Sequence, residues 1–217
     1  MHPATRWPKG PFPEKYRFDA VAARLDGAWS LGPTSALVAA LGGPGGWVDE
    51  AYDDPYVRVF GRAAATSADD GAWLRDARSL AVDSGCHVFV WSPPDRGGRG
   101  DGRMADTDAP MRLGVVASAD PIDAIVACGV AGPAQGVGLT TVVRFVATLR
   151  SFATLDVDTI GEDRLGMTLA PRSVTAPSRI AERALQVCPG LVRSVGRAED
   201  LEARMAQTGR LDLDWSS

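Results

Sequence analysis

Histidine and cysteine, the residue types used most often for acid–base and metal chemistry, are scarce in this chain. There are two histidines, His2 and His87, and three cysteines. Cys86 directly precedes His87 on a predicted strand, where neighbouring side chains point to opposite faces, so a Cys–His dyad is disfavoured. A zinc site needs three or four converging ligands. We therefore expect no metal and no catalytic residue of these types.

The cysteines Cys86, Cys128 and Cys188 are odd in number and widely spaced, which excludes a disulfide framework and a CxxC metal knuckle. We expect them to be small buried hydrophobic residues in a reducing compartment. No apolar run approaches the roughly 18 residues that span a bilayer, and no apolar segment follows the basic N-terminal residues. These features predict a cytoplasmic protein without a membrane partner.

Lysine is limited to Lys9 and Lys15, and asparagine is absent, so arginine supplies nearly all the positive charge. The net charge of −4 argues against nucleic acid as a partner, because phosphate binding normally needs a basic surplus. The glycine clusters 42–46 and 132–138 fit neither GxGxxG nor GxxxxGK[ST], and no lysine stands beside them. We expect tight turns there rather than an anion site, and no cofactor.

The 217 residues, 45% of them hydrophobic, are enough for a sizeable core. We expect one compact unit with four parts: a proline-rich arm at 1–17, an N-terminal half at 18–118, a flexible loop within it at 92–110, and a C-terminal half at 119–217.

Hydrophobic periodicity assigns the elements of the two halves. In the N-terminal half it predicts helices at 18–25, at 34–41 and from Asp69 and Asp70, and strands at 47–52, 56–61, 86–91 and 111–118. The third helix is expected to carry Trp73, Leu74, Ala77 and Leu80 on one side. In the C-terminal half it predicts, in order, a helix from Asp120 to Cys128, a helix capped by Thr140 or Thr141, a hairpin over 153–169, a helix from Pro177, a strand over 191–195, a helix through Leu201 and Met205, and a last strand from Leu211. The pattern indicates an α+β fold whose mixed or antiparallel sheet has helices mainly on one face, and two similar α-β-β-α-β halves are one interpretation.

Several short blocks follow one another from residue 120 to the end of the chain. They are Asp120–Val126, Gly132–Thr141, Asp163–Met167, Val187–Val192 with Gly196–Leu201, and Thr208–Ser216. In order and spacing they resemble the C-terminal domain of an uncharacterised bacterial family known as DUF4253, which opens with a D-x-x-D pattern. The family's asparagines and its WWD ending are replaced here, so a site built from them elsewhere would be altered in this chain. The resemblance implies a fold and supplies no activity.

Paired aspartates are the remaining candidates for a functional site. Asp156 and Asp158 alternate with Leu155, Val157 and Thr159, and Asp212 and Asp214 alternate with Leu211, Leu213 and Trp215. The alternation predicts two solvent-facing pairs, each about 7 Å apart along its strand, opposite an apolar face. A solvated surface is the simpler interpretation, because catalysis would need a raised pKa. We take the four aspartates and Trp215 as candidate binding residues and name no catalytic residue.

Two functions are compatible with these features. The first is a non-enzymatic binding protein, similar to an inhibitor or immunity protein, that presents an acidic sheet face to a protein partner. The alternative is a small-molecule enzyme or ligand-binding protein of secondary metabolism with its site between the two halves, using Arg and Asp side chains with Trp47, Trp73 or Trp91. Oligomeric state has no signature in the sequence.

Overall fold

The computed structural model describes residues 12–41, 47–50, 54–62, 70–92, 112–132, 135–170 and 173–215. Its helices are, in chain order, η1 (Glu14–Tyr16), α1 (Phe18–Leu25), η2 (Ala28–Ser30), α2 (Gly32–Leu41), α3 (Asp70–Val82), α4 (Pro121–Ala127), α5 (Leu139–Leu149), α6 (Pro177–Val187), α7 (Leu191–Val195) and α8 (Ala198–Thr208). Its strands are β1 (Trp47–Glu50), β2 (Val57–Arg62), β3 (His87–Ser92), β4 (Arg112–Val116), β5 (Leu155–Gly161), β6 (Arg164–Leu169) and β7 (Arg210–Asp214).

The strands form one open sheet in the order β1-β2-β4-β3-β5-β6-β7. Neighbouring strands are antiparallel except β3 and β5, which are parallel. The parallel pair lies where the N-terminal half of the chain meets the C-terminal half, so both halves share one sheet. The predicted α+β fold with a mixed, mostly antiparallel sheet is confirmed.

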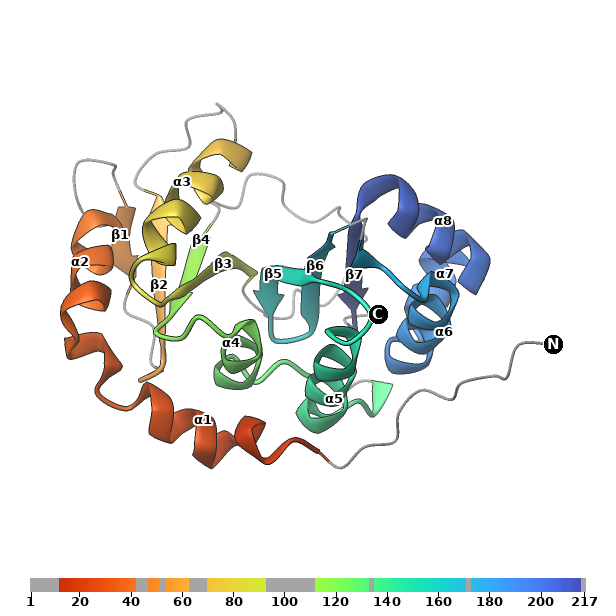
Figure 1. Cartoon of the computed structure of the whole chain (residues 1–217), viewed down its shortest axis with the longest axis horizontal. Helices are drawn as coiled ribbons and strands as arrows, with labels where there is room; N and C mark the ends of the chain where they lie inside the picture. The colour runs from red at the N-terminus through yellow and green to blue at the C-terminus, as the bar shows by residue number, and fades with distance from the viewer. Residues whose placement is uncertain are drawn as a thin grey trace, which may run out of the picture.

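Helices lie mainly on one face of the sheet, as the sequence predicts. Residues of α1, α4, α5, α6, α7 and α8 join the larger core cluster on that face, whereas α2 and α3 pack on the opposite face against β2, β3 and β4. In Figure 1, α1, α4 and α5 lie below the sheet and α3 lies above it. Among the described residues, no helix covers the opposite face of β5, β6 and β7. That surface is called the open face below.

The two halves share an order of elements but not an arrangement of strands. The N-terminal half runs α2-β1-β2-α3-β3, and the C-terminal half runs α5-β5-β6, then α6 to α8, then β7. However, β4 separates β2 from β3, whereas β7 pairs directly with β6. The similarity is therefore one of sequence order only.

The segment Leu191–Val195 is helix α7 and not the predicted strand. Leu191 is buried, Val192 is half exposed, and Val195 packs against the core. The four-residue spacing of Leu191 and Val195 is a helical period, which a run of only five residues does not distinguish from a strand.

Two smaller expectations are also wrong. Helix α5 begins after Gly138, and neither predicted threonine caps it with its side chain. On α3, Ala77 and Ala81 are buried and Leu80 is 51% exposed, so Leu80 does not share the side of Ala77 as expected.

Three predicted regions lie wholly or partly outside the described residues: most of the arm, the glycine run 42–46 and the loop beyond Ser92. The described end of the arm contains η1, whose Tyr16 is buried. Within the part of the chain that the structure describes, no helix is both long and apolar enough to cross a membrane.

Candidate functional site

The four candidate aspartates lie together on the open face. The register pairs Asp156 of β5 with Thr168 of β6, and Thr168 with Arg210 of β7; a second row pairs Gly166 with Asp212, and a third pairs Arg164 with Asp214. Because side chains directly across a sheet share a face, the two predicted pairs form one surface across three strands. Sequence alternation placed Asp156, Asp212 and Asp214 correctly on the exposed side, but the expectation that Asp158 also faces solvent is wrong, because Asp158 is buried. The alternation also could not show that the two pairs are neighbours.

Strand β5 carries a bulge that changes which residues reach the open face. The register with β6 shifts between Val157 and Thr159, so Asp158 is the extra residue. A Cβ atom built on Gly166 would lie 3.1 Å from Thr159 Cβ and 3.0 Å from an oxygen of Asp212, so Thr159 shares their face. The expectation that Thr159 points inward with Val157 is therefore wrong, and Ile160 is fully buried instead.

Three arginines lie among the aspartates, and this corrects the expectation of an acidic surface. Arg164 Nη2 lies 3.1 Å from Asp214, and Arg210 Nη2 lies 3.2 Å from Asp212. Arg78 of α3 contributes the third positive charge. The period of two along β7 also exposes Arg210, so sequence could have found it; Arg78 is about 80 residues from its partners and could not be found in this way.

Arg78 joins the two halves of the sheet. Its Nε donates to the carbonyl oxygen of Val88 in β3 at 3.2 Å, and its Nη2 donates to that of Val157 in β5 at 3.0 Å. Its Nη1 lies 2.7 Å from Asp158 and 3.0 Å from Asp156. Asp158 is buried and also accepts a short hydrogen bond from Thr168. One guanidinium therefore holds both strands and both carboxylates.

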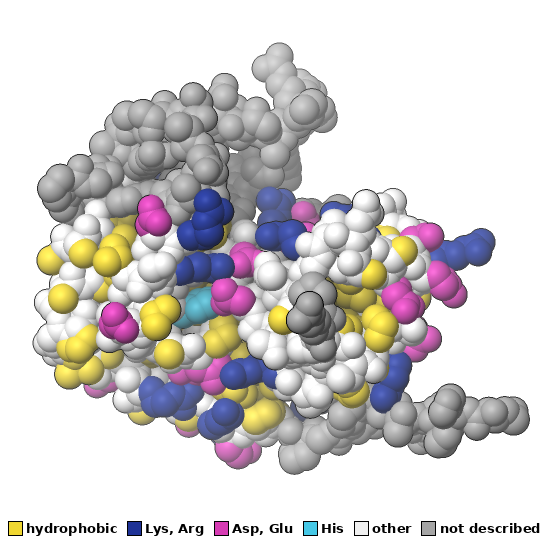
Figure 2. Space-filling model, turned by 45° about the horizontal axis from the view of Figure 1, so that its top comes forward, with side chains coloured by type: hydrophobic (Ala, Val, Ile, Leu, Met, Phe, Trp, Pro, Cys, Tyr) yellow, Lys and Arg dark blue, Asp and Glu magenta, His cyan; other side chains and the backbone are white. Residues whose placement is uncertain are grey.

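His87 occupies the same seam between β3 and β5. The backbone pairing of these strands covers only residues 90–92 with 159–161. Next to it, His87 Nε2 donates to the Val157 carbonyl at 3.0 Å, so side chains of His87 and Arg78 take the place of further backbone pairing. Burial lowers the pKa of His87 and favours the neutral ring. In Figure 2, basic (dark blue) and acidic (magenta) side chains lie close together near the middle of the view.

The neighbouring Cys86 does not share this seam. It packs with Leu37 and Val88 in the smaller core cluster, whereas the His87 ring stacks on Phe89 of the larger one. The predicted separation of the two side chains is confirmed. All three cysteines are free, and burial raises the pKa of the Cys128 and Cys188 thiols.

Trp215, the fifth candidate, lies in the core and not on the open face. It is fully buried, and its indole Nε1 donates to the Val187 carbonyl at 2.9 Å. A Cβ on Gly132 would lie 2.4 Å from the indole ring, so the glycine-rich turn before α5 packs directly on it. Trp215 therefore anchors α6 and this turn to β7 and offers no surface to a ligand.

A pocket of about 390 Å³ opens on this face above β6 and β7. It is lined by Thr159, Arg164, Gly166, Asp212, Leu213 and Asp214. Thr159, Arg164, Asp212 and Asp214 supply its polar and charged groups. Among the described residues, no group of three His, Cys, Asp or Glu side chains is arranged to hold a metal ion.

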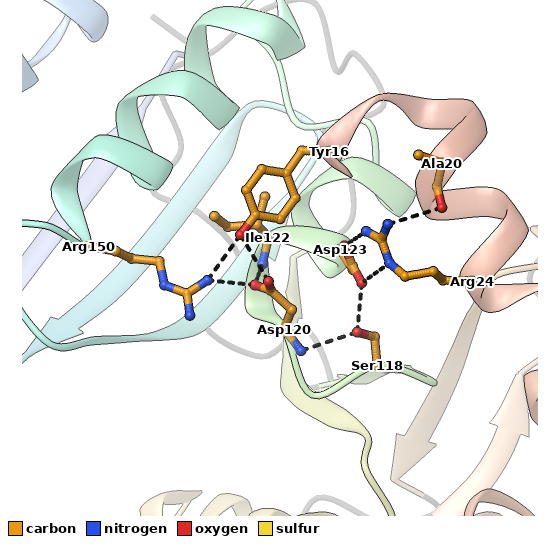
Figure 3. Close-up of polar contacts among 8 residues, drawn as sticks. All are labelled: Tyr16, Ala20, Arg24, Ser118, Asp120, Ile122, Asp123 and Arg150. Atoms are coloured by element: carbon orange, nitrogen blue, oxygen red, sulfur yellow. Dashed lines mark hydrogen bonds and ion pairs between the residues drawn. The ribbon is translucent and has the colours of Figure 1, made fainter. Parts of the chain in front are cut away.

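A second polar cluster lies on the helical side of the molecule (Figure 3). Asp120 caps α4, and its carboxylate accepts from Tyr16 at 2.9 Å and from Arg150 at 2.8 Å. The buried Asp123 accepts two bonds from Arg24 of α1 and one from Ser118. Both aspartates of the D-x-x-D block therefore fasten η1 and α1 onto α4 and α5, which is a structural role.

Comparisons with known proteins find no counterpart. No family model, no curated protein and no solved structure matches the chain. The resemblance to DUF4253 rests on the sequence blocks alone.

Proposed function

We propose that this chain is a non-enzymatic binding protein that engages a protein partner through the open face of β5, β6 and β7. The observation that supports the proposal is the exposed charge on this face. The side chains of Asp156, Arg164, Arg210, Asp212 and Asp214 are each between 41% and 51% exposed, and no described helix covers them.

The charged side chains on this face can exchange their ion pairs within the chain for ion pairs with another protein. Exposed ion pairs are worth only about 0–1 kcal/mol, so pairs such as Arg164–Asp214 can open to contact another protein at little cost. The backbone beneath them is held by a core in which Leu165, Leu211 and Leu213 are fully buried. A rigid sheet carrying rearrangeable charges lowers the ordering cost of binding.

The chain's net charge of −4 favours a basic partner, which is the pattern of a stoichiometric inhibitor or immunity protein. Charge complementarity mainly accelerates encounter and selects among partners. Binding should therefore weaken as salt rises and screens the exposed charges.

The test is affinity capture with three forms of the full chain, at low and high salt. The open-face variant is Asp156→Asn, Asp212→Asn and Asp214→Asn; the matched control is Asp26→Asn, Glu182→Gln and Glu199→Gln, which removes the same charge from exposed sites elsewhere. We expect one protein, identified by mass spectrometry, to be retained by the wild type and the control at low salt and lost by the open-face variant. Equal retention by both variants would contradict the proposal.

A second candidate function, a small-molecule site between the two halves, has one observation in its favour. His87 and Arg78 both donate to the Val157 carbonyl where the halves join, and Arg78 pairs there with Asp156 and Asp158, which gathers acid, base and cation at one seam. A thermal-shift screen with a metabolite library tests it. A ligand that stabilises the wild type but not His87→Gln would favour this function, and a screen without such a ligand would count against it.

A further inference from the structure

The pocket on the open face has a glycine at its centre. Gly166 lies in the middle strand, in the row Thr159–Gly166–Asp212, with Arg164 and Thr168 two residues away on either side. A Cβ at this position would come within 3.0 Å of the Asp212 Oδ1 and 3.3 Å of the Thr159 Oγ1. The glycine therefore leaves a hollow in a surface otherwise filled by side chains, and both oxygens point toward it.

The groups around this hollow favour a cation over an anion. The pocket lining holds two carboxylates, Asp212 and Asp214, and one guanidinium, Arg164. A second guanidinium, Arg210, lies beside the lining and is shared between Asp212 and the buried Asp158. Arg164 already contacts Asp214, so an anion would meet a partly neutralised cation and an adjacent carboxylate. Asp212 Oδ1 accepts a hydrogen bond from Arg210 Nη2 at 3.2 Å. Because a carboxylate accepts about four hydrogen bonds, Asp212 can accept further donors from a guest.

We propose that this pocket binds the ammonium or guanidinium group of a lysine or arginine side chain from the protein partner. The guest's charged end lies over Gly166 and donates to Asp212 and to the Thr159 hydroxyl, and Asp214 contributes a second negative charge. The inference deepens the proposed function and rests on it, because it names the chemistry by which the open face recognises its partner.

The experiment uses the full chain and simple probes. Amide chemical shifts are followed by NMR during titration with Nα-acetyl-arginine methylamide, with the citrulline analogue as a neutral probe of the same shape and the glutamate analogue as an anionic one. We expect the arginine probe to produce saturable shifts at Gly166, Thr159 and Asp212, and the other two to produce none. Equal shifts from citrulline, stronger binding of glutamate, or no saturable shift with arginine would each overturn the proposal.

Two substitutions separate binding at this pocket from general attraction to the protein. Gly166→Ala fills the hollow, and Gly32→Ala, at a position where a Cβ meets nothing within 4 Å, is its matched control. Asp212→Asn keeps the shape and removes the charge, so it stays informative if Gly166→Ala does not fold. We expect Asp212→Asn to weaken arginine binding about fivefold, the equivalent of about 1 kcal/mol, Gly166→Ala to abolish it, and Gly32→Ala to leave it unchanged. Unchanged binding in Asp212→Asn would overturn the proposal.

The outcomes distinguish this inference from the proposed function. The arginine probe could bind at Gly166 while the open-face variant still retains the partner. That result would support the pocket as a cation site and would reject the open face as the partner's binding site. Conversely, the open-face variant could lose the partner while the arginine probe does not bind. That result would support the open face as the partner's binding site and would reject the pocket as the site of a lysine or arginine side chain.

Discussion

The two halves of the sheet differ in how many of their faces are covered. In the N-terminal half, Leu113, Val115 and Val116 of β4 are fully buried because helices lie on both sides. In the C-terminal half, β7 alternates between the buried Leu211 and Leu213 and the partly exposed Asp212 and Asp214. A strand covered on both faces is uniformly apolar, and a strand covered on one face alternates. Among the side chains that the structure describes, a cluster of charged residues therefore lies on the strand surface of the C-terminal half.

The largest expected effect tests the covered face of the C-terminal half. Trp215→Ala removes a fully buried indole and its hydrogen bond to Val187, so we expect the free energy of unfolding to fall by about 3–5 kcal/mol. Val192→Ala, an exposed apolar site, should cost less than about 0.5 kcal/mol. Urea unfolding followed by far-ultraviolet circular dichroism measures both. Similar costs for the two variants would show that Trp215 does not anchor this face.

The next effect concerns the seam that separates the halves. Arg78→Met leaves the buried Asp158 with Thr168 and a 3.6 Å contact to Arg210, so we expect a loss of about 1–3 kcal/mol in unfolding free energy. Arg164→Met removes a guanidinium of the exposed pair with Asp214 and should cost less than about 1 kcal/mol. The same urea titration compares them. If Arg164→Met lowered the unfolding free energy as much as Arg78→Met, the seam would stabilise the fold no more than an exposed ion pair does.

The contrast between the halves also explains how far sequence can predict this molecule. The alternation along β5 and β7 depends on whether each side chain contacts water or the core, which is a local property. It therefore predicted the exposed Asp156, Asp212 and Asp214 and the buried Leu213 correctly. The bulge at Asp158 is set by pairing with β6 and shifted Thr159 to the other face. The contact of Arg78 with Asp158 spans 80 positions and depends on α3 reaching across the seam. Such long-range pairings leave no periodic signal in a single sequence.

The pH dependence of stability gives a smaller effect at the seam. Burial lowers the folded-state pKa of His87, so between that value and the unfolded value of about 6.5 only the unfolded chain binds the proton. The contribution of the neutral His87 to the free energy of unfolding is therefore present above pH 6.5 and is lost as the pH falls below it. We expect the wild type to lose at most about 1.4 kcal/mol between pH 7.5 and 5.5. The charged groups that act on the ring are Arg78 of α3 and Asp156 and Asp158 of β5.

His87→Gln isolates the contribution of this histidine. Its amide can still donate to the Val157 carbonyl but does not titrate, so the decline in unfolding free energy between pH 7.5 and 5.5 should largely disappear. Measuring urea unfolding at several pH values provides the comparison. If the unfolding free energy of the variant declined as steeply as that of the wild type, the pH dependence would come from groups other than His87.

The smallest expected effect concerns the open face. In a double-mutant cycle of Arg164→Gln and Asp214→Asn, the coupling in unfolding free energy should be about 0.5 kcal/mol or less and should vanish in high salt, because both side chains are more than 40% exposed. Coupling well above about 1 kcal/mol would mean that this pair is a fixed part of the fold. A fixed pair could not open for a partner at low cost, so that result would contradict the proposed function. Weak coupling here, beside a strong effect of Arg78→Met, would show that one sheet combines a seam built for stability with a surface whose charges can change partners.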